Sequence, residues 1–274
     1  MRIRLAQLAD VDRLTDIYVQ SLKDDPFTLY FWPKIIEAKQ KAAHEQGNGP
    51  MHRMVQQMEE SYKLEQREHI TDSLYDKSMV VIVAEKVAGV DLDVHQDTVV
   101  GYCTWEWVTL GESARASGEA MVQKICSESF PKCPRPSMAG KRPAPNHAWC
   151  SSSPRSETRI QAAAEDTEKS HAEDFANQGI TQWWSIEQLA THPNHRQQGV
   201  GRYLVGWGFE KADRFGNMCA ADCAAGAESQ EDTLRFYQRL GFALPKHLRT
   251  VQVKGDVPCR YAVLKRAPGA SAAK

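Results

Sequence analysis

The sequence predicts an α/β protein, because short apolar runs alternate along the chain with longer stretches of helical periodicity. Residues 79–84 and 98–108 are rich in β-branched side chains and are typical of buried strands. Residues 199–215, in contrast, carry apolar side chains at helical spacing. Of the 274 residues, 42% are hydrophobic and 25% charged, which is ordinary for a globular chain that buries a full core.

The first 75 residues predict one short strand followed by helices. Residues 1–8 alternate as a strand does, and Asp10 to Asp12 open an amphipathic helix that ends at Asp24-Asp25-Pro26-Phe27. A second helical region, 32–75, is interrupted at Gly47-Asn48-Gly49-Pro50, which is typical of a turn.

A change of composition marks residues 111–179 as an insertion between the third and fourth strands. The segment has few aliphatic side chains and a cluster of prolines, although 112–125 and 158–175 favour helix. We interpret it as a partly ordered part of a single domain spanning 1–274. It is either a functional lid or a disordered loop.

Beyond residue 180 the elements become short and well delimited. The predicted order is a strand at 183–191, the helix at 199–215 ended by Gly216-Asn217, a strand at 218–224, a helix at 231–240 ended by Gly241, and closing strands at 248–253 and 260–264.

Charge and cysteine content exclude several classes of protein. A net charge of −1 gives no general attraction to nucleic acid or to an anionic membrane. No apolar run approaches the roughly 20 residues that span a bilayer, and the first residues lack the apolar core of a signal peptide. Seven cysteines cannot all pair, so we expect free thiols in a reducing, cytoplasmic setting.

The segment Gln198-Gly199-Val200-Gly201-Arg202 joins a strand to a helix, which is an arrangement that cradles phosphate. A P-loop needs Gly-Lys-Ser/Thr after its second glycine, and Arg202-Tyr203 stands there instead. A dinucleotide fingerprint needs a third glycine where Leu204 stands. Both alternatives fail, and a plain tight turn into a helix remains the other interpretation.

Arg196-Gln197-Gln198-Gly199-Val200-Gly201 resembles the CoA-binding signature of the GNAT superfamily of N-acetyltransferases. Two flanking segments strengthen the resemblance: Leu189 to Pro193 is similar to the family's strand end, and Leu234 to Phe242 to its tyrosine-containing helix. The resemblance covers about 1–110 and 180–265.

This resemblance implies a mixed, mostly antiparallel sheet with helices on both faces, and acetyl-CoA as co-substrate with no metal. The pyrophosphate would lie on backbone amides of the loop, and the pantetheine arm would pair with the preceding strand, where two central strands separate. The implied cofactor-binding residues are Leu189, Ala190, Thr191, Arg196, Gln197, Gln198, Gly199, Val200, Gly201, Arg202 and Phe236.

The catalytic residues implied by the resemblance are Tyr237, which would protonate the departing thiolate, and Glu187, which would accept the proton of the amine. Tyr237 is otherwise a packed aromatic residue, and Glu187 a solvated or ion-paired acid. Strict alternation along the strand places Glu187 on the face of Trp183, Ser185, Leu189 and Thr191. Glu106, facing away from its two neighbouring tryptophans, is the second candidate for the base.

Four other features suggest chemistry but favour simpler interpretations. Asp24 and Asp25 contact substrate or cap a helix. His192 and His195 are loop residues near the cofactor, since no third metal ligand is apparent. Cys219 and Cys223 lie about 13 Å apart on a strand and are therefore packing residues. Trp183 and Trp184 place one ring on each face of the sheet.

We therefore expect an N-acetyltransferase that acts on the primary amine of a small molecule, as a monomer or homodimer, with no nucleic-acid or membrane partner. A peptide or protein amine is the alternative acceptor. A non-catalytic CoA-binding interaction module is the alternative from a different class.

Overall fold

The computed structural model describes residues 1–22, 41, 49–86, 98–133, 135, 154–224, 228–251 and 259–270. Its centre is a seven-stranded sheet in the order β1-β2-β3-β4-β5-β7-β6. The strands are β1 (Arg2–Leu5), β2 (Met79–Glu85), β3 (Val99–Thr109), β4 (Gln182–Thr191), β5 (Met218–Ala224), β6 (Arg249–Val251) and β7 (Cys259–Arg266). Only β4 and β5 pair in parallel, which confirms the mixed, mostly antiparallel sheet.

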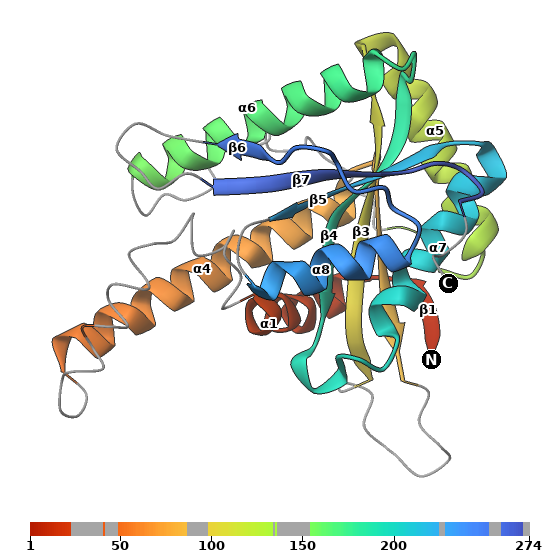
Figure 1. The fold of residues 1–274 in the computed structure, drawn as a ribbon. Helices are drawn as coiled ribbons and strands as arrows, with labels where there is room; N and C mark the ends of the chain where they lie inside the picture. The colour runs from red at the N-terminus through yellow and green to blue at the C-terminus, as the bar shows by residue number, and fades with distance from the viewer. Residues whose placement is uncertain are drawn as a thin grey trace.

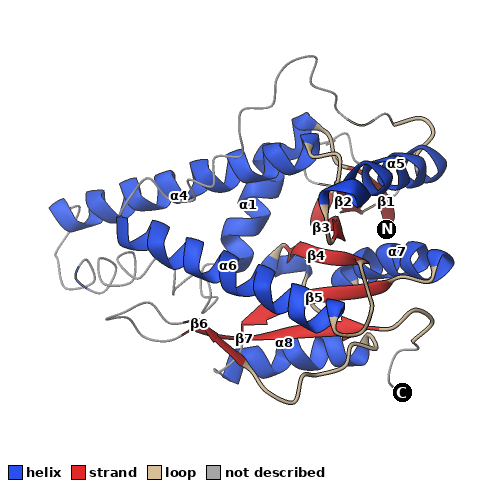
Figure 2. Cartoon of the chain, turned by 90° about the horizontal axis from the view of Figure 1, so that it is seen from above, coloured by secondary structure: helices blue, strands red, loops and turns tan. Residues whose placement is uncertain are grey.

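Helices cover both faces of this sheet, as the sequence predicts (Figure 2). One face, called the α6 face below, carries α1 (Val11–Leu22), α4 (Pro50–Tyr75) and α6 (Pro154–Ala176). The other, called the α7 face, carries α5 (Glu112–Ser129), α7 (Val200–Phe215) and α8 (Glu228–Arg239). Two short 3-10 helices, η1 (Leu8–Asp10) and η2 (Pro193–His195), complete the described elements.

The two tryptophans of β4 divide between the faces. Trp183 stacks on Phe175 of α6, with ring centroids 4.2 Å apart. Trp184 meets Trp105 and Trp107 edge-on in the core of the α7 face. The predicted placement of one ring on each face is confirmed.

Both helices predicted within the insertion are present and join the main cores. Val122 and Ile125 of α5 are buried against the α7 face. Helix α6 crosses the opposite face above β5, β6 and β7 (Figure 1). The Tyr261 hydroxyl of β7 bonds to α6 through Asp166 at 2.7 Å and Ser170 at 3.1 Å. The described parts of the insertion are therefore built into the domain.

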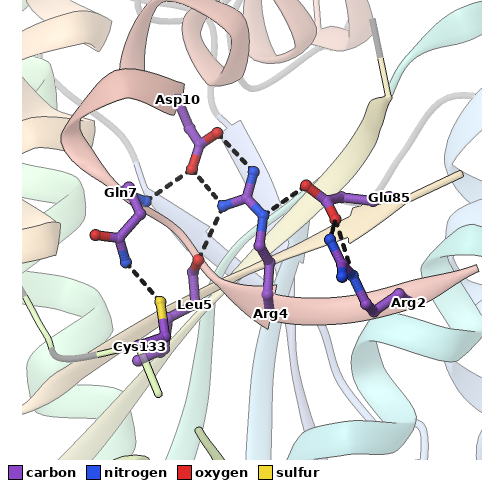
Figure 3. Close-up of polar contacts among 7 residues, drawn as sticks. All are labelled: Arg2, Arg4, Leu5, Gln7, Asp10, Glu85 and Cys133. Atoms are coloured by element: carbon purple, nitrogen blue, oxygen red, sulfur yellow. Dashed lines mark hydrogen bonds and ion pairs between the residues drawn. The ribbon is translucent and has the colours of Figure 1, made fainter. Parts of the chain in front are cut away.

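An ion-pair network fixes the edge strand β1 to its neighbours (Figure 3). Arg4 lies between the carboxylates of Glu85 on β2 and Asp10 in η1, and Arg2 donates a second bond to Glu85 at 2.6 Å. Asp10 also accepts the backbone amide of Gln7 at 2.7 Å. The start of α1 is thereby held at the edge of the sheet.

No helix in the described part of the chain is long and apolar enough to cross a membrane.

Candidate active site

The loop between β4 and α7 presents free backbone amides at the start of a helix. Gln197 and Gly199 both have left-handed backbones, with φ of 59° and 80°. The first bond of α7 runs from the Tyr203 amide to the Gly199 carbonyl. Within the described residues, no backbone carbonyl accepts from the amides of 197–202. These amides and the positive end of α7 can therefore bind an anionic phosphate.

The end of β4 and one aromatic residue of α8 meet this loop at Gly201. A Cβ built on Gly201 would lie 3.3 Å from the Phe236 ring and 3.9 Å from Thr191 Oγ1. The structure thus brings together three of the residues that the sequence predicts at the cofactor. Ala190 has a buried side chain, so only its backbone is left to contact a ligand.

Arg196 and the two histidines lie at the start of the loop between β4 and α7. Arg196 donates to the backbone carbonyl of Ser21 at the end of α1, at 2.6 Å. The rings of His192 and His195 are 5.6 Å apart. The described ranges contain no group of three side chains arranged to hold a metal ion. Asp24 and Asp25 lie outside the described residues.

Strands β4 and β5 separate halfway along their length. Their parallel pairing runs from Trp183–Met218 to Ile186–Ala221 and then stops, although both strands continue. In Figure 1 the antiparallel pair β3 and β4 extends vertically, whereas the antiparallel pair β5 and β7 extends toward the left of the view. The edge of β4 beyond Ile186 therefore has no partner strand on the β5 side among the described residues. A ligand chain can pair with that edge.

A β-bulge lies on β4 at the point where the strands separate. Thr104 of β3 pairs with Gln188 of β4. The next residue of β3, Trp105, pairs with Ile186. Glu187 is therefore the extra residue of the bulge.

The bulge overturns one prediction made from strict alternation. Leu189 packs on the α7 face together with Ile186, and Thr191 lies beside Gly201 of α7. Neither shares the face of Trp183 and Ser185, because the extra residue shifts the alternation by one position. The prediction that grouped these four residues on one face was wrong.

Glu187 and Glu106 lie side by side on the α6 face. Glu106 stands opposite Ser185 in the ladder, and its carboxyl group shares a hydrogen bond with that of Glu187. Burial, followed by the charges of Glu187 and Asp76, raises the pKa of Glu106. The bond raises the pKa of Glu106 and lowers that of Glu187, so Glu106 is the protonated donor and Glu187 the acceptor.

The Glu187 carboxyl group combines crowded surroundings with access to solvent. Loss of water raises its pKa, and the charge of Asp222 raises it further. The hydrogen bond from Ser185, the charge of His171 and the bond with Glu106 act in the opposite direction without cancelling the rise. Because its side chain is exposed, an amine can reach it. A carboxylate with a raised pKa is a suitable general base near neutral pH.

Tyr237 of α8 is buried in the core of the α7 face. Its ring meets Phe236 and Phe242 edge-on, each with a centroid separation of 5.2 Å. Burial raises the pKa of the hydroxyl, and Cys223, Cys103 and Asp222 raise it further. The phenol therefore stays protonated at neutral pH, as a proton donor must. The charge of Asp222 raises the pKa of both Tyr237 and Glu187.

Sequence analysis missed His171, which α6 brings to the same point. Its Nε2 lies 3.0 Å from Oδ1 of Asp222, the first residue of β5 beyond the parallel pairing. No local pattern marks His171 within the insertion. The available signal was Asp222 itself, an acid inside the otherwise uncharged strand Met218–Ala224.

Cys219 and Cys223 both lie in the core of the α7 face. Burial raises the pKa of Cys219 to about 12, because a thiolate loses its hydration there. The interpretation of the two residues as packing residues agrees with this placement.

One family model matches the segment that contains the loop. Residues 161–244 match the family model described as the GNAT acetyltransferase domain. The matched segment contains most of α6, all of β4, α7, β5 and α8, and both residues of the His171–Asp222 contact. No curated protein sequence matches the chain.

Solved structures of acetyltransferases resemble the chain over nearly its full length at low identity. One is described as histone acetyltransferase HPA2 and related acetyltransferase from Corynebacterium glutamicum, at 15% identity and a TM-score of 0.48, covering 97% of this chain and 96% of that one. Another is Arabidopsis thaliana NAA60 in complex with acetyl-CoA, at 11% identity and a TM-score of 0.49, covering 97% of each chain.

Proposed function

We propose that the chain is an N-acetyltransferase of the GNAT kind, which moves the acetyl group of acetyl-CoA to the primary amine of a small molecule; the match of residues 161–244 to the GNAT acetyltransferase domain supports this. The observation that carries this proposal is the opening where β4 separates from β5, because the two sides of this opening carry different chemical groups. Free amides and Phe236 lie on the α7 side, and the acids Glu106 and Glu187 lie on the α6 side.

The proposed reaction is direct attack in a ternary complex. The cofactor phosphates bind the amides of 197–202, and the pantetheine arm pairs with the open edge of β4. The amine gives its proton to Glu187, its nitrogen attacks the thioester carbonyl carbon, and backbone amides near the bulge stabilise the oxyanion. The C–S bond then breaks, Tyr237 protonates the thiolate, and the second proton of the nitrogen returns to the Tyr237 oxygen, which gives CoA and the N-acetyl amine.

The choice of a small-molecule acceptor rests on the position of the acids. Glu106 and Glu187 attract an ammonium group, and helices α4 and α6 lie on the same face of the sheet (Figure 2). A small amine passes beside these helices more easily than a folded polypeptide does.

The test is acetyl transfer by the full chain to a panel of acceptors. Aromatic amines, aliphatic mono- and diamines, and peptides with free lysine or N-terminal amines are incubated with acetyl-CoA, and CoA release and acetylated product are both measured. Turnover of small amines supports the proposal, and turnover of peptides alone favours the alternative acceptor. Acetyl-CoA binding without turnover of any amine would overturn the proposal that the chain is an enzyme, and would favour a non-catalytic interaction module.

A further inference from the structure

Helix α6 holds the His171 ring firmly at the opening between β4 and β5. The ring meets Phe175 and Trp183 edge-on, with centroids 6.0 and 5.9 Å away, and these two rings stack on each other. His171 is only 8% exposed, and its Nε2 lies 3.0 Å from Oδ1 of Asp222. Two aromatic walls and one hydrogen bond therefore fix the orientation of the imidazole.

The surroundings of His171 favour its charged form. Burial alone lowers the pKa of the ring. The hydrogen bond and charge of Asp222 outweigh burial, with further help from Glu187 and Asp174, so the pKa is raised. The effect is mutual, because the positive ring lowers the pKa of Glu187.

Other elements add the remaining charges near the two acids. Strand β3 contributes Glu106, and Asp76 follows the end of α4. Arg115 of α5 is the other cation among these described neighbours, and its charge lowers the pKa of Glu106. Acids thus outnumber cations around Glu187, and His171 is the cation whose charge acts on Glu187 directly.

We propose that His171 is a positioning residue of the active site, which holds Asp222 and supplies the positive charge that keeps Glu187 ionised and ready to accept a proton. Helix α6 is then part of the catalytic centre as well as a cover for the sheet. This inference rests on the proposed acetyl transfer, because it assigns Glu187 the role of base.

The decisive variant is His171→Gln, because glutamine can still donate to Asp222 but carries no charge. The acid side of the pH profile of kcat/KM should move to higher pH by about one unit, since Glu187 loses the positive charge that lowers its pKa. At a given pH on the acid side of the profile, kcat/KM of the variant is then about tenfold below that of the wild type. On the high-pH plateau the two values stay within about twofold. The Kd for acetyl-CoA should not change.

Tyr261→Phe is the matched control, because it removes the bonds of α6 to β7 through Asp166 and Ser170 without changing a charge beside Glu187. It should lower Tm and leave the shape of the pH profile unchanged. If it moves the acid side as far as His171→Gln does, loosening of α6 explains the shift and the proposal fails. A pH-independent loss of rate in His171→Gln would also overturn it.

A second measurement covers the case in which His171→Gln does not fold. Titration of the histidine rings of the wild-type chain by NMR should show His171 still protonated at pH 7, and a neutral ring there would overturn the proposal. This titration needs no turnover. Failure of the proposed function would instead appear as a wild-type chain that acetylates no amine.

Discussion

The two sides of the opening between β4 and β5 are built in different ways. The side proposed to bind acetyl-CoA, called the cofactor side, is continuous in sequence, since the end of β4, the loop and the start of α7 follow one another from 189 to 202. The acceptor side is assembled from Glu106, His171, Glu187 and Asp222, which come from four elements and span more than a hundred residues. A continuous site depends on local backbone conformation, whereas an assembled site depends on how distant elements pack.

The two sides also differ in the groups that do the chemistry. Free amides serve the cofactor side, so many side chains are tolerated there but a change of backbone conformation is not. Carboxyl and imidazole groups serve the acceptor side, where replacing one charged atom by a neutral one changes the chemistry. Substitutions should therefore separate kcat effects from cofactor-binding effects.

The largest effect is expected for Glu187→Gln, which removes the general base and keeps the side-chain volume. We expect kcat/KM for the amine to fall about 10²- to 10⁴-fold, with the Kd for acetyl-CoA unchanged. In the wild-type chain kcat/KM should fall as the pH drops through the raised pKa of Glu187, because the base becomes protonated. That acid side should disappear in the variant.

Glu210→Gln is the matched control, because Glu210 is an exposed residue of α7 that pairs with Lys211. It should leave the rate and the pH profile unchanged. A Glu187→Gln variant that keeps the wild-type rate would exclude Glu187 as the general base and leave Glu106 as the candidate for that role.

Tyr237→Phe should have the next largest effect, a fall in kcat of about 10²-fold, because the departing thiolate loses its proton donor. The ring contacts with Phe236 and Phe242 are retained, so the Kd for acetyl-CoA should stay within about twofold. The defect should shrink with an acetyl thioester of a more acidic thiol, which leaves without protonation. An equal defect with both donors would assign Tyr237 a packing role.

Sequence reasoning predicted the continuous side well, because each residue there acts through local rules. The glycine of a left-handed turn, the helix that follows it and the cap at Gly216 are all encoded within a few positions, and Gly216 does adopt φ of 68°. The strand Met218–Ala224 is likewise predicted with its observed bounds, and the helix cap at Gly216 marks the turn before its start.

Sequence reasoning failed where long-range packing decides the outcome. The bulge at Glu187 depends on how β4 pairs with β3, and alternation along β4 alone does not reveal it. His171 lies 51 residues before its partner Asp222, and only the path of α6 over the sheet brings the two together. Burial and the neighbouring charges then set the ionisation of both groups, which no local pattern encodes.

Gly199→Val should have the smallest of these effects on activity and tests the cofactor side. A Cβ at Gly199 would meet no protein atom within 4 Å, so the cost comes from the backbone, whose φ of 80° strains a β-branched residue. Strain of about 1–3 kcal/mol, relieved by a shift of the loop, predicts a roughly 10- to 100-fold weaker Kd for acetyl-CoA. At saturating acetyl-CoA, kcat should be nearly normal.

The same substitution at Gly206, also in open space on α7 but with no positive φ, provides the control for this prediction. Gly206→Val should leave the Kd for acetyl-CoA unchanged, which isothermal titration calorimetry would measure for both variants. If both variants bind equally well, the left-handed backbone at Gly199 is not needed to present the amides. If Gly199→Val instead lowers kcat at saturation, the cofactor loop and the acids on the α6 face are coupled, and the two sides are not as separate as their construction indicates.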